Sequence, residues 1–269
     1  MKPVVRAAAV QFAADPLDKK ASIARADRLV RQAAEQGADL ILLPETAFTG
    51  YTLGPRFREV CEPVPGPSSD AMSALAAELK VHLAFGMGEL EGERIRNALL
   101  LFGPDGRLLA KHWKAHLYSA DVEAGFTPGD SLAVCPTELG AIGLLVCKDS
   151  HLIESVRVLD KMGAEIVLIP SVGVAPDDAV YDTIDRWRWR MLANALFGRV
   201  FVVRADKVGR EGPWLMIGHS MIIHPRAWML AEGDMKEQVI VADLRDPWPE
   251  GKPPDSDRRP DLYGPLAEP

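Results

Sequence analysis

Short apolar runs, bounded by glycine, proline or charged residues, recur along nearly the whole of this 269-residue chain. Runs of this kind predict buried β-strands. Four amphipathic segments between them predict helices, at residues 20–36, 70–79, 152–162 and 181–197. Other neighbouring runs are joined by turn sequences, and Gly103-Pro104-Asp105-Gly106 predicts a hairpin. Helical connections and hairpins together predict an α/β fold with mixed sheets, and two packed sheets with helices outside would bury this many strands.

The chain shows one change of composition along its length. Hydrophobic residues make up 48% and charged residues 26%, as in ordinary globular proteins. Residues 1–246 contain no linker or internal repeat and predict one domain. After Asp246 the sequence becomes rich in Pro, Asp and Arg. Residues 247–269 therefore predict an extended C-terminal tail of the same domain.

The charge and the cysteine count limit the partners and the compartment. A formal net charge of -7 argues against nucleic acid or an anionic membrane as the main partner. No apolar run approaches the roughly 18 residues that a membrane helix needs, and the N-terminus does not have the pattern of a signal peptide. Three scattered cysteines do not form a disulfide framework. These features predict a cytoplasmic protein.

Residues 140–147 form an apolar run that ends in Cys147 and turns at once into Lys148-Asp149-Ser150. The amphipathic segment that follows predicts a helix, so Cys147 is expected on a sharp strand-to-helix turn. Such turns often hold a nucleophile, because helix N-terminal N–H groups can lower a thiol pKa and bind a developing oxyanion. The alternative is a small buried thiol that closes a strand.

Two other predicted strands end in groups that would serve such a nucleophile. Glu45 follows an apolar strand and Pro44, where a carboxylate is costly to bury unless it is paired or acts as a base. Lys114 follows the hairpin strand and could hold an oxyanion. A loop glutamate and a surface lysine are the alternatives. No histidine is placed to pair with Cys147, so Glu45 is the expected base.

His112 and His116 have the spacing of zinc ligands on one helical face. No glutamate follows His112 and no third ligand stands out. We therefore expect no metal site here.

Several segments, in their order along the chain, resemble the nitrilase superfamily of carbon–nitrogen hydrolases. The main matches are LLPETAFTGY around Glu45, HWKAHL around Lys114 and GLLVCKDSHLIESVR around Cys147. Secondary matches are FTPGD, GHSMIIHPRAWMLAE and DRRPDLY. The resemblance implies a four-layer α-β-β-α sandwich with two mixed β-sheets, commonly a homodimer or an assembly of dimers. It also implies catalysis by Glu45, Lys114 and Cys147 without a metal or organic cofactor.

The reaction implied by the resemblance is hydrolysis of a small-molecule amide, carbamoyl compound or nitrile through a cysteine thioester. Many members carry a second glutamate between the lysine and the Pro-Gly-Asp turn. Here Asp121 and Glu123 compete for this role, and Glu123 is favoured. Both could instead be solvated loop charges.

The sequence departs from the family pattern after the nucleophile, and this bears on the substrate. The run Cys147-Lys148-Asp149 does not match the cysteine-tryptophan-glutamate run of true nitrilases, which favours an amide. Lys148 would receive a substrate carboxylate, as in an ω-amidase or a carbamoyl-acid hydrolase, or would point to solvent. The other predicted pocket residues are Tyr51, Ser171 and Val172. A nitrilase, an acyl transferase and a non-catalytic interaction protein of the same fold are the alternative functions.

Overall fold

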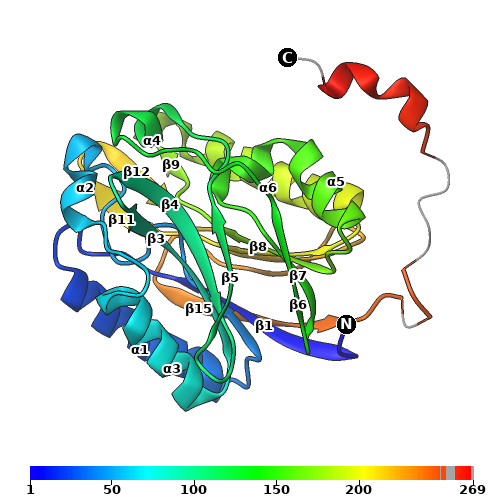
Figure 1. The fold of residues 1–269 in the computed structure, drawn as a ribbon, viewed down its shortest axis with the longest axis horizontal. Helices are drawn as coiled ribbons and strands as arrows, with labels where there is room; N and C mark the ends of the chain where they lie inside the picture. Colours follow the sequence, from blue (N-terminus) through cyan, green and yellow to red (C-terminus); the bar gives the residue numbers. More distant parts are fainter. Residues whose placement is uncertain (249, 253–257, 268–269) are drawn as a thin grey trace.

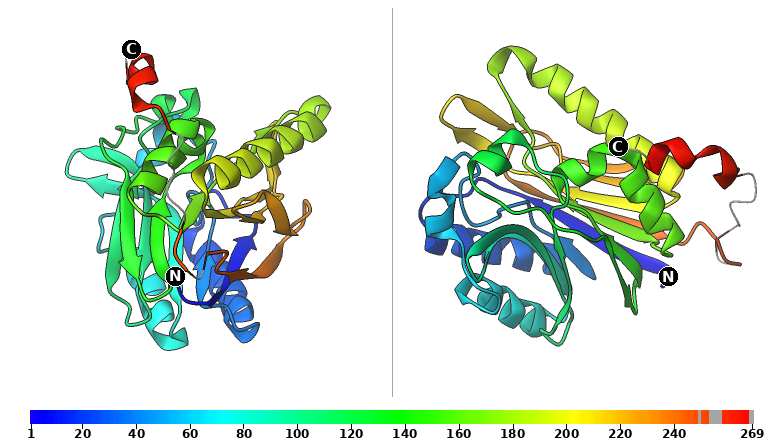
Figure 2. Two further views of the ribbon diagram at one scale, coloured as in Figure 1. Left: turned by 90° about the vertical axis from the view of Figure 1, so that its right-hand side faces the viewer. Right: turned by 45° about the horizontal axis from the view of Figure 1, so that its top comes forward.

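The computed structural model describes residues 1–248, 250–252 and 258–267 of the chain. Two six-stranded sheets pack face to face, and helices cover the outer face of each sheet (Figures 1 and 2). The predicted four-layer α-β-β-α sandwich with two mixed sheets is thus confirmed.

The first sheet has the strand order β15-β1-β2-β3-β4-β5. Its strands are β1 (Val4–Gln11), β2 (Leu40–Leu42), β3 (His82–Glu91), β4 (Arg94–Phe102), β5 (Leu108–Trp113) and β15 (Gln238–Arg245). β1, β2 and β3 run parallel, and the other neighbours are antiparallel. The helices α1 (Lys19–Glu35) and α3 (Pro67–Leu79) cover its outer face.

The second sheet has the strand order β14-β13-β10-β8-β7-β6. Its strands are β6 (Ala133–Thr137), β7 (Gly140–Leu144), β8 (Ile166–Pro170), β10 (Phe201–Ala205), β13 (Met221–His224) and β14 (Trp228–Glu232). The three central strands β7, β8 and β10 run parallel. The helices α5 (Ile153–Lys161) and α6 (Val180–Gly198) pack on the outer face.

Strand β1 shows how the sequence pattern produces the layers. Successive side chains of a strand point to opposite faces. Val5, Ala7 and Ala9 belong to the core between the two sheets, whereas Ala8 and Val10 pack with α1 and α3. Because both faces are buried from Ala7 onward, residues 7–10 are continuously apolar, whereas Arg6 is exposed near the start of the strand.

A small third sheet was not predicted from the sequence. It consists of β9 (Val174–Ala175), β11 (Val208–Glu211) and β12 (Trp214–Ile217). Three short helices, α2 (Phe57–Val60), α4 (Ser119–Glu123) and the single turn Cys147–His151, complete the connections near the site. These elements are too short to give a periodic signal of their own.

The C-terminal region contains two short helical turns, Pro260–Leu262 and Gly264–Ala267. They lie apart from the sandwich, at the red end of the ribbon in Figure 1. Residues 249, 253–257 and 268–269 of the predicted tail lie outside the described residues. The division at residue 246 therefore stays a prediction.

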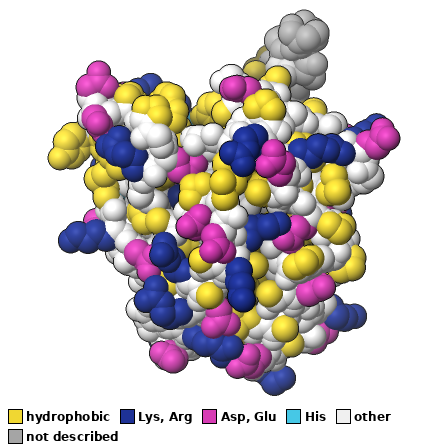
Figure 3. Space-filling view, turned by 90° about the vertical axis from the view of Figure 1, so that its left-hand side faces the viewer, with side chains coloured by type: hydrophobic (Ala, Val, Ile, Leu, Met, Phe, Trp, Pro, Cys, Tyr) yellow, Lys and Arg dark blue, Asp and Glu magenta, His cyan; other side chains and the backbone are white. Residues whose placement is uncertain are grey.

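Two surface properties bear on the partners. On the face drawn in Figure 3, Lys and Arg side chains are interspersed with Asp and Glu side chains. Among the described residues, no helix combines the length and the apolar character needed to cross a membrane.

Candidate active site

Lys114, which follows β5, lies between two carboxylates in the interior. Its Nζ is 2.8 Å from Oε1 of Glu45 and 2.6 Å from Oδ2 of Asp121. All three side chains are buried. Burial lowers the pKa of Lys114, but the surrounding negative groups, Glu45 first among them, outweigh this and raise the pKa well above its usual 10.5. Lys114 is therefore a permanent cation in this cluster.

The carboxylate beside Lys114 is Asp121, and not Glu123 as the sequence prediction favoured. Asp121 also accepts hydrogen bonds from the backbone N–H of Tyr118 at 2.8 Å and from the hydroxyl of Tyr51 at 3.2 Å. These contacts turn the first turn of α4 inward. Glu123, two residues later, is exposed and lines a surface cavity.

Glu45 follows β2 in a turn that packs closely on β3. A Cβ atom at Gly86 would lie 2.5 Å from the Cα of Glu45, so the close approach of the two segments requires glycine there. The next residue, Thr46, has a positive φ of 43°. The ammonium group of Lys207 donates hydrogen bonds to Thr46 Oγ1, at 3.2 Å, and to the carbonyl of Thr49, which fixes this turn.

The two oxygens of Glu45 have different surroundings. Oε1 accepts hydrogen bonds from Lys114 and, at 2.7 Å, from the side-chain amide of Asn97. Oε2 is buried and has no hydrogen-bond partner among the described residues. Burial raises the pKa of Glu45, with Asp121 adding to the effect and Lys114 opposing it. A carboxylate in this state can accept a proton more readily than an exposed one.

Asn97 is a site residue that the sequence reasoning missed. It lies on β4, and its amide reaches both Glu45 and, at 3.5 Å, Oδ1 of Asp121. Its backbone carbonyl accepts from the N–H of Lys114 at 2.8 Å. An asparagine inside the apolar run of β4 was the available signal, because a buried amide needs partners.

Cys147 follows β7 and has a φ of +47°, which places it on a strained strand-to-helix turn. It is 1% exposed. Burial and the charge of Glu45 raise the pKa of the thiol well above 9.0, while Lys114 and the backbone N–H of Val172 act against them. The expectation that the turn lowers the thiol pKa is therefore wrong for this structure. The resting group is a thiol, and it needs a base to become a nucleophile.

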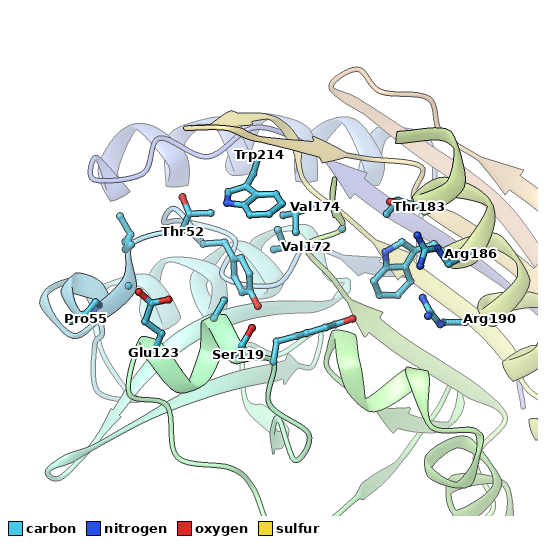
Figure 4. A pocket seen from close by; sticks show the side chains of 17 residues that line it. Thr52, Pro55, Ser119, Glu123, Val172, Val174, Thr183, Arg186, Arg190 and Trp214 are labelled. Carbon is cyan, nitrogen blue, oxygen red and sulfur yellow. The ribbon is translucent and has the colours of Figure 1, made fainter. Parts of the chain in front are cut away.

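A cavity of about 750 Å³ lies next to this cluster (Figure 4). Its lining includes Tyr51, which donates a hydrogen bond to Asp121, and Val172, whose backbone N–H contacts Cys147. Glu45, Lys114 and Cys147 themselves are not among the residues that line it. Residues 51–55, α4, α6 and the small sheet all contribute to its wall, with Trp214, Glu123, Arg186, Trp187 and Arg190 among the lining residues. Of the predicted pocket residues, Tyr51 and Val172 line it.

The profile of the carbon-nitrogen hydrolase family matches residues 6–247. The chain belongs to this family. It is therefore a carbon–nitrogen hydrolase, and the predicted relation to the nitrilase superfamily is confirmed.

Relatives of the hydrolase include enzymes named for different substrates. It is 32% identical over 252 residues to omega-amidase NIT2 of Xenopus tropicalis, with 89% of this chain and 88% of the relative covered. It is 30% identical to a nitrilase of Pyrococcus abyssi over 90% of both chains. An amidase from Nesterenkonia sp. superposes with a TM-score of 0.83 at 26% identity, over 98% of this chain and 97% of that chain. A mutant of the Nesterenkonia sp. AN1 amidase shows the acetamide moiety of fluoroacetamide covalently added at the active site cysteine.

Two predicted substrate-binding residues of the hydrolase do not line the cavity. The ammonium group of Lys148 donates to the carbonyl of Leu117 at 2.6 Å and lies 4.9 Å from the ring centroid of Tyr118. Ser171 is fully buried, and its hydroxyl donates to the carbonyl of Ile169. Both side chains have hydrogen-bond partners inside the protein, and neither is among the residues that line the cavity.

Asp149 joins the turn that carries Cys147 to the segment after Lys114. Its carboxylate accepts from the backbone N–H groups of Val146, Ala115 and His116 at 2.8–3.1 Å. It also contacts the rings of His112 and His116 at 2.9 and 2.8 Å. Although burial opposes it, these hydrogen bonds hold the pKa of Asp149 well below its usual range. The two histidines with metal-ligand spacing therefore serve a carboxylate.

Proposed function

We propose that this hydrolase converts a small amide or carbamoyl compound into an acid and ammonia through a thioester on Cys147. The amide class rests on the omega-amidase and amidase relatives. The thioester rests on the covalent adduct at the cysteine of the Nesterenkonia amidase.

In the first half-reaction Cys147 attacks the carbonyl carbon of the amide. The thiol proton passes to Glu45, for which the unpartnered Oε2 is the suitable atom. The carbonyl electron pair moves onto oxygen, and the C–N bond then breaks. Glu45 returns the proton to the leaving nitrogen, so ammonia departs and an acyl thioester remains.

In the second half-reaction water replaces ammonia. Glu45 takes a proton from water as the oxygen attacks the thioester carbon. The C–S bond breaks, the acid leaves, and Glu45 returns its proton to the sulfur. One glutamate thus serves both halves, and no redox partner is needed.

The oxyanion of each tetrahedral intermediate is assigned to Lys114 and the backbone N–H of Lys148. An ammonium group has three N–H donors. Contacts with Glu45 and Asp121 use two of them, and the third is available for the substrate oxygen. Asp121 would then act as a positioning residue that holds Lys114 beside Glu45.

The observation that carries this proposal is the buried contact between Glu45 and Lys114. One oxygen of this carboxylate has no hydrogen-bond partner among the described residues, and the ammonium group beside it stays charged. The pair lies close to the cavity through Tyr51 and Tyr118. The order Glu45, Lys114 and Cys147 along the chain also matches the family segments.

The test is ammonia release from a matched panel of amides, carbamoyl amino acids and nitriles, with product masses recorded. We expect release from an amide or carbamoyl compound, free acid as product, and none with Cys147→Ala. Release from nitriles alone would favour the activity named for the Pyrococcus relative. An amine-linked product would indicate acyl transfer, and no release from any compound would contradict the proposal.

We also propose that the hydrolase is a homodimer, or an assembly of dimers, in the cytoplasm. The outer surface of α5 and α6 exposes large apolar side chains, Val158, Met162, Leu196 and Phe197, which supports a contact between copies.

The cytoplasmic location is supported by the cysteines, because all three are free, as in a reducing compartment. Sedimentation should give a dimer or larger that Phe197→Asp weakens, and cell fractionation should recover the protein with cytosolic markers. A wild-type monomer, or recovery with membranes, would contradict these proposals.

A further inference from the structure

Arg190 is a half-buried guanidinium in the wall of the cavity. Its neighbours on α6 have acidic partners: Arg186 pairs with Asp182, and Arg188 pairs with Glu232 at 2.7 Å. For Arg190, the described part of the chain provides no hydrogen bond or ion pair. A partly desolvated cation without a partner costs free energy unless a ligand supplies the opposite charge.

The charges of the cavity are separated between its ends. Figure 4 shows Arg186 and Arg190 on one side, across the cavity from Glu123. Glu123 is the one carboxylate among the lining residues that the structure describes. Because Asp182 already engages Arg186, no carboxylate among the described residues pairs with Arg190.

The pKa of His151 also indicates a positive electrostatic environment at this end of the cavity. His151 contacts the hydroxyl of Tyr118 at 3.0 Å and the ring of Trp187 at 4.8 Å between centroids, and both of these partners line the cavity. Burial lowers the pKa of His151 to about 3, with further lowering by Arg190, Arg204, Lys114 and Lys148. His151 is thus neutral at physiological pH and adds no positive charge beside Arg190. An anion is the ligand that this end of the cavity can stabilise.

We propose that Arg190 binds a carboxylate of the substrate, at the end of the molecule distant from the scissile amide. A guanidinium matches the two oxygens of one carboxylate in a bidentate pair. The substrate would then be the monoamide of a dicarboxylic acid or a similar anionic amide. This inference rests on the proposed amide hydrolysis and adds a specificity-determining residue to it.

The structure gives this role to Arg190 in place of Lys148. Both are cations near Tyr118, but the ammonium group of Lys148 is held by the carbonyl of Leu117. Arg190 lines the cavity and Lys148 does not.

The test compares two amides in the wild-type enzyme and in Arg190→Gln. One is the monoamide of glutaric acid, and the other is pentanamide, which has the same carbon chain with a methyl group in place of the carboxylate. We expect the wild type to prefer the anionic amide. Arg190→Gln should lower kcat/KM for it by about 10- to 100-fold, mainly through KM, because a hydrogen bond to a charged group is lost. The effect on pentanamide should stay within about threefold.

Two further variants separate pairing from a general effect of charge. Arg188→Gln removes the same charge from the same helix outside the cavity, and should leave the preference unchanged. Arg190→Lys keeps the charge without the bidentate geometry, and should fall between wild type and Arg190→Gln. Monoamides from malonic to adipic acid would identify the chain length that fits.

The outcomes distinguish the inference from the function on which it rests. Equal use of both amides by the wild type, or equal losses on both amides in Arg190→Gln, would overturn the role of Arg190 while amide hydrolysis stands. Loss of the preference in Arg188→Gln would also overturn it. If neither these amides nor the carbamoyl compounds of the wider panel release ammonia, the proposed function itself fails.

Discussion

Two buried carboxylates, Glu45 and Asp121, both contact the buried ammonium group of Lys114. Two carboxylates this close together and away from water are costly to keep ionised. The raised pKa of Glu45 reflects that cost, first through burial and also through Asp121. Strong perturbation of this kind is common where a carboxylate has to exchange a proton during a reaction.

Substitution of Asp121 should lower kcat far more than substitution of Glu123. Asp121→Asn removes a charge that contacts Lys114 at 2.6 Å, whereas Glu123 is exposed. We expect kcat to fall by about 10²-fold in Asp121→Asn, as for a misplaced catalytic group. Glu123→Gln should change kcat by less than about threefold. Steady-state rates with one amide check this, and the opposite ranking would restore Glu123 as the supporting carboxylate.

Activity should fall on acidification at a higher pH than an exposed glutamate would give. Glu45 must be ionised to accept the thiol proton, and burial raises its pKa above the usual 4.5. Protonation therefore removes the base as the pH falls through this raised pKa. Lys114 stays charged well above 10.5 and does not limit activity near neutral pH. A pH profile of kcat/KM measures this, and an acidic midpoint at or below 4.5 would contradict it.

The side chains of the candidate site follow the ends of β-strands. Glu45, Lys114 and Cys147 follow β2, β5 and β7, and a polar group after a buried apolar strand is visible in the sequence. The sequence does not determine which carboxylate of α4 turns inward, because that depends on contacts of Asp121 with Tyr118 and Lys114. The direction of Lys148 likewise depends on the carbonyl of Leu117. Such tertiary contacts leave no periodic signal.

Asp149 should be a stability determinant of the turn that carries Cys147. Asp149→Asn keeps the shape but removes the charge that three backbone N–H groups and two histidines contact. We expect the free energy of unfolding to fall by about 3 kcal/mol or more. Urea unfolding measures this.

A second readout separates this role from a general loss of stability. The hydrogen bond to Asp149 is the main cause that raises the pKa of His116 above 6.5. In Asp149→Asn, NMR titration should therefore show a lower His116 pKa. An unchanged unfolding midpoint together with an unchanged His116 pKa would contradict the role of Asp149.

The whole molecule is a four-layer sandwich in which Glu45, Lys114 and Cys147 follow strand ends next to one cavity. The layers could be predicted, because short apolar runs and amphipathic segments recur along the sequence. The cavity wall could not, because the short strands of the third sheet contribute to it. One signal was available: Arg186 and Arg190 lie four residues apart and therefore on one face of α6.

The most direct test of a thioester on Cys147 is intact-mass spectrometry of the enzyme, quenched in acid during turnover of an amide that it hydrolyses. We expect an added mass equal to the acyl group less one hydrogen, located on Cys147 by peptide mapping and absent from Cys147→Ala. An acyl group on another residue, or undiminished ammonia release by Cys147→Ala, would contradict it.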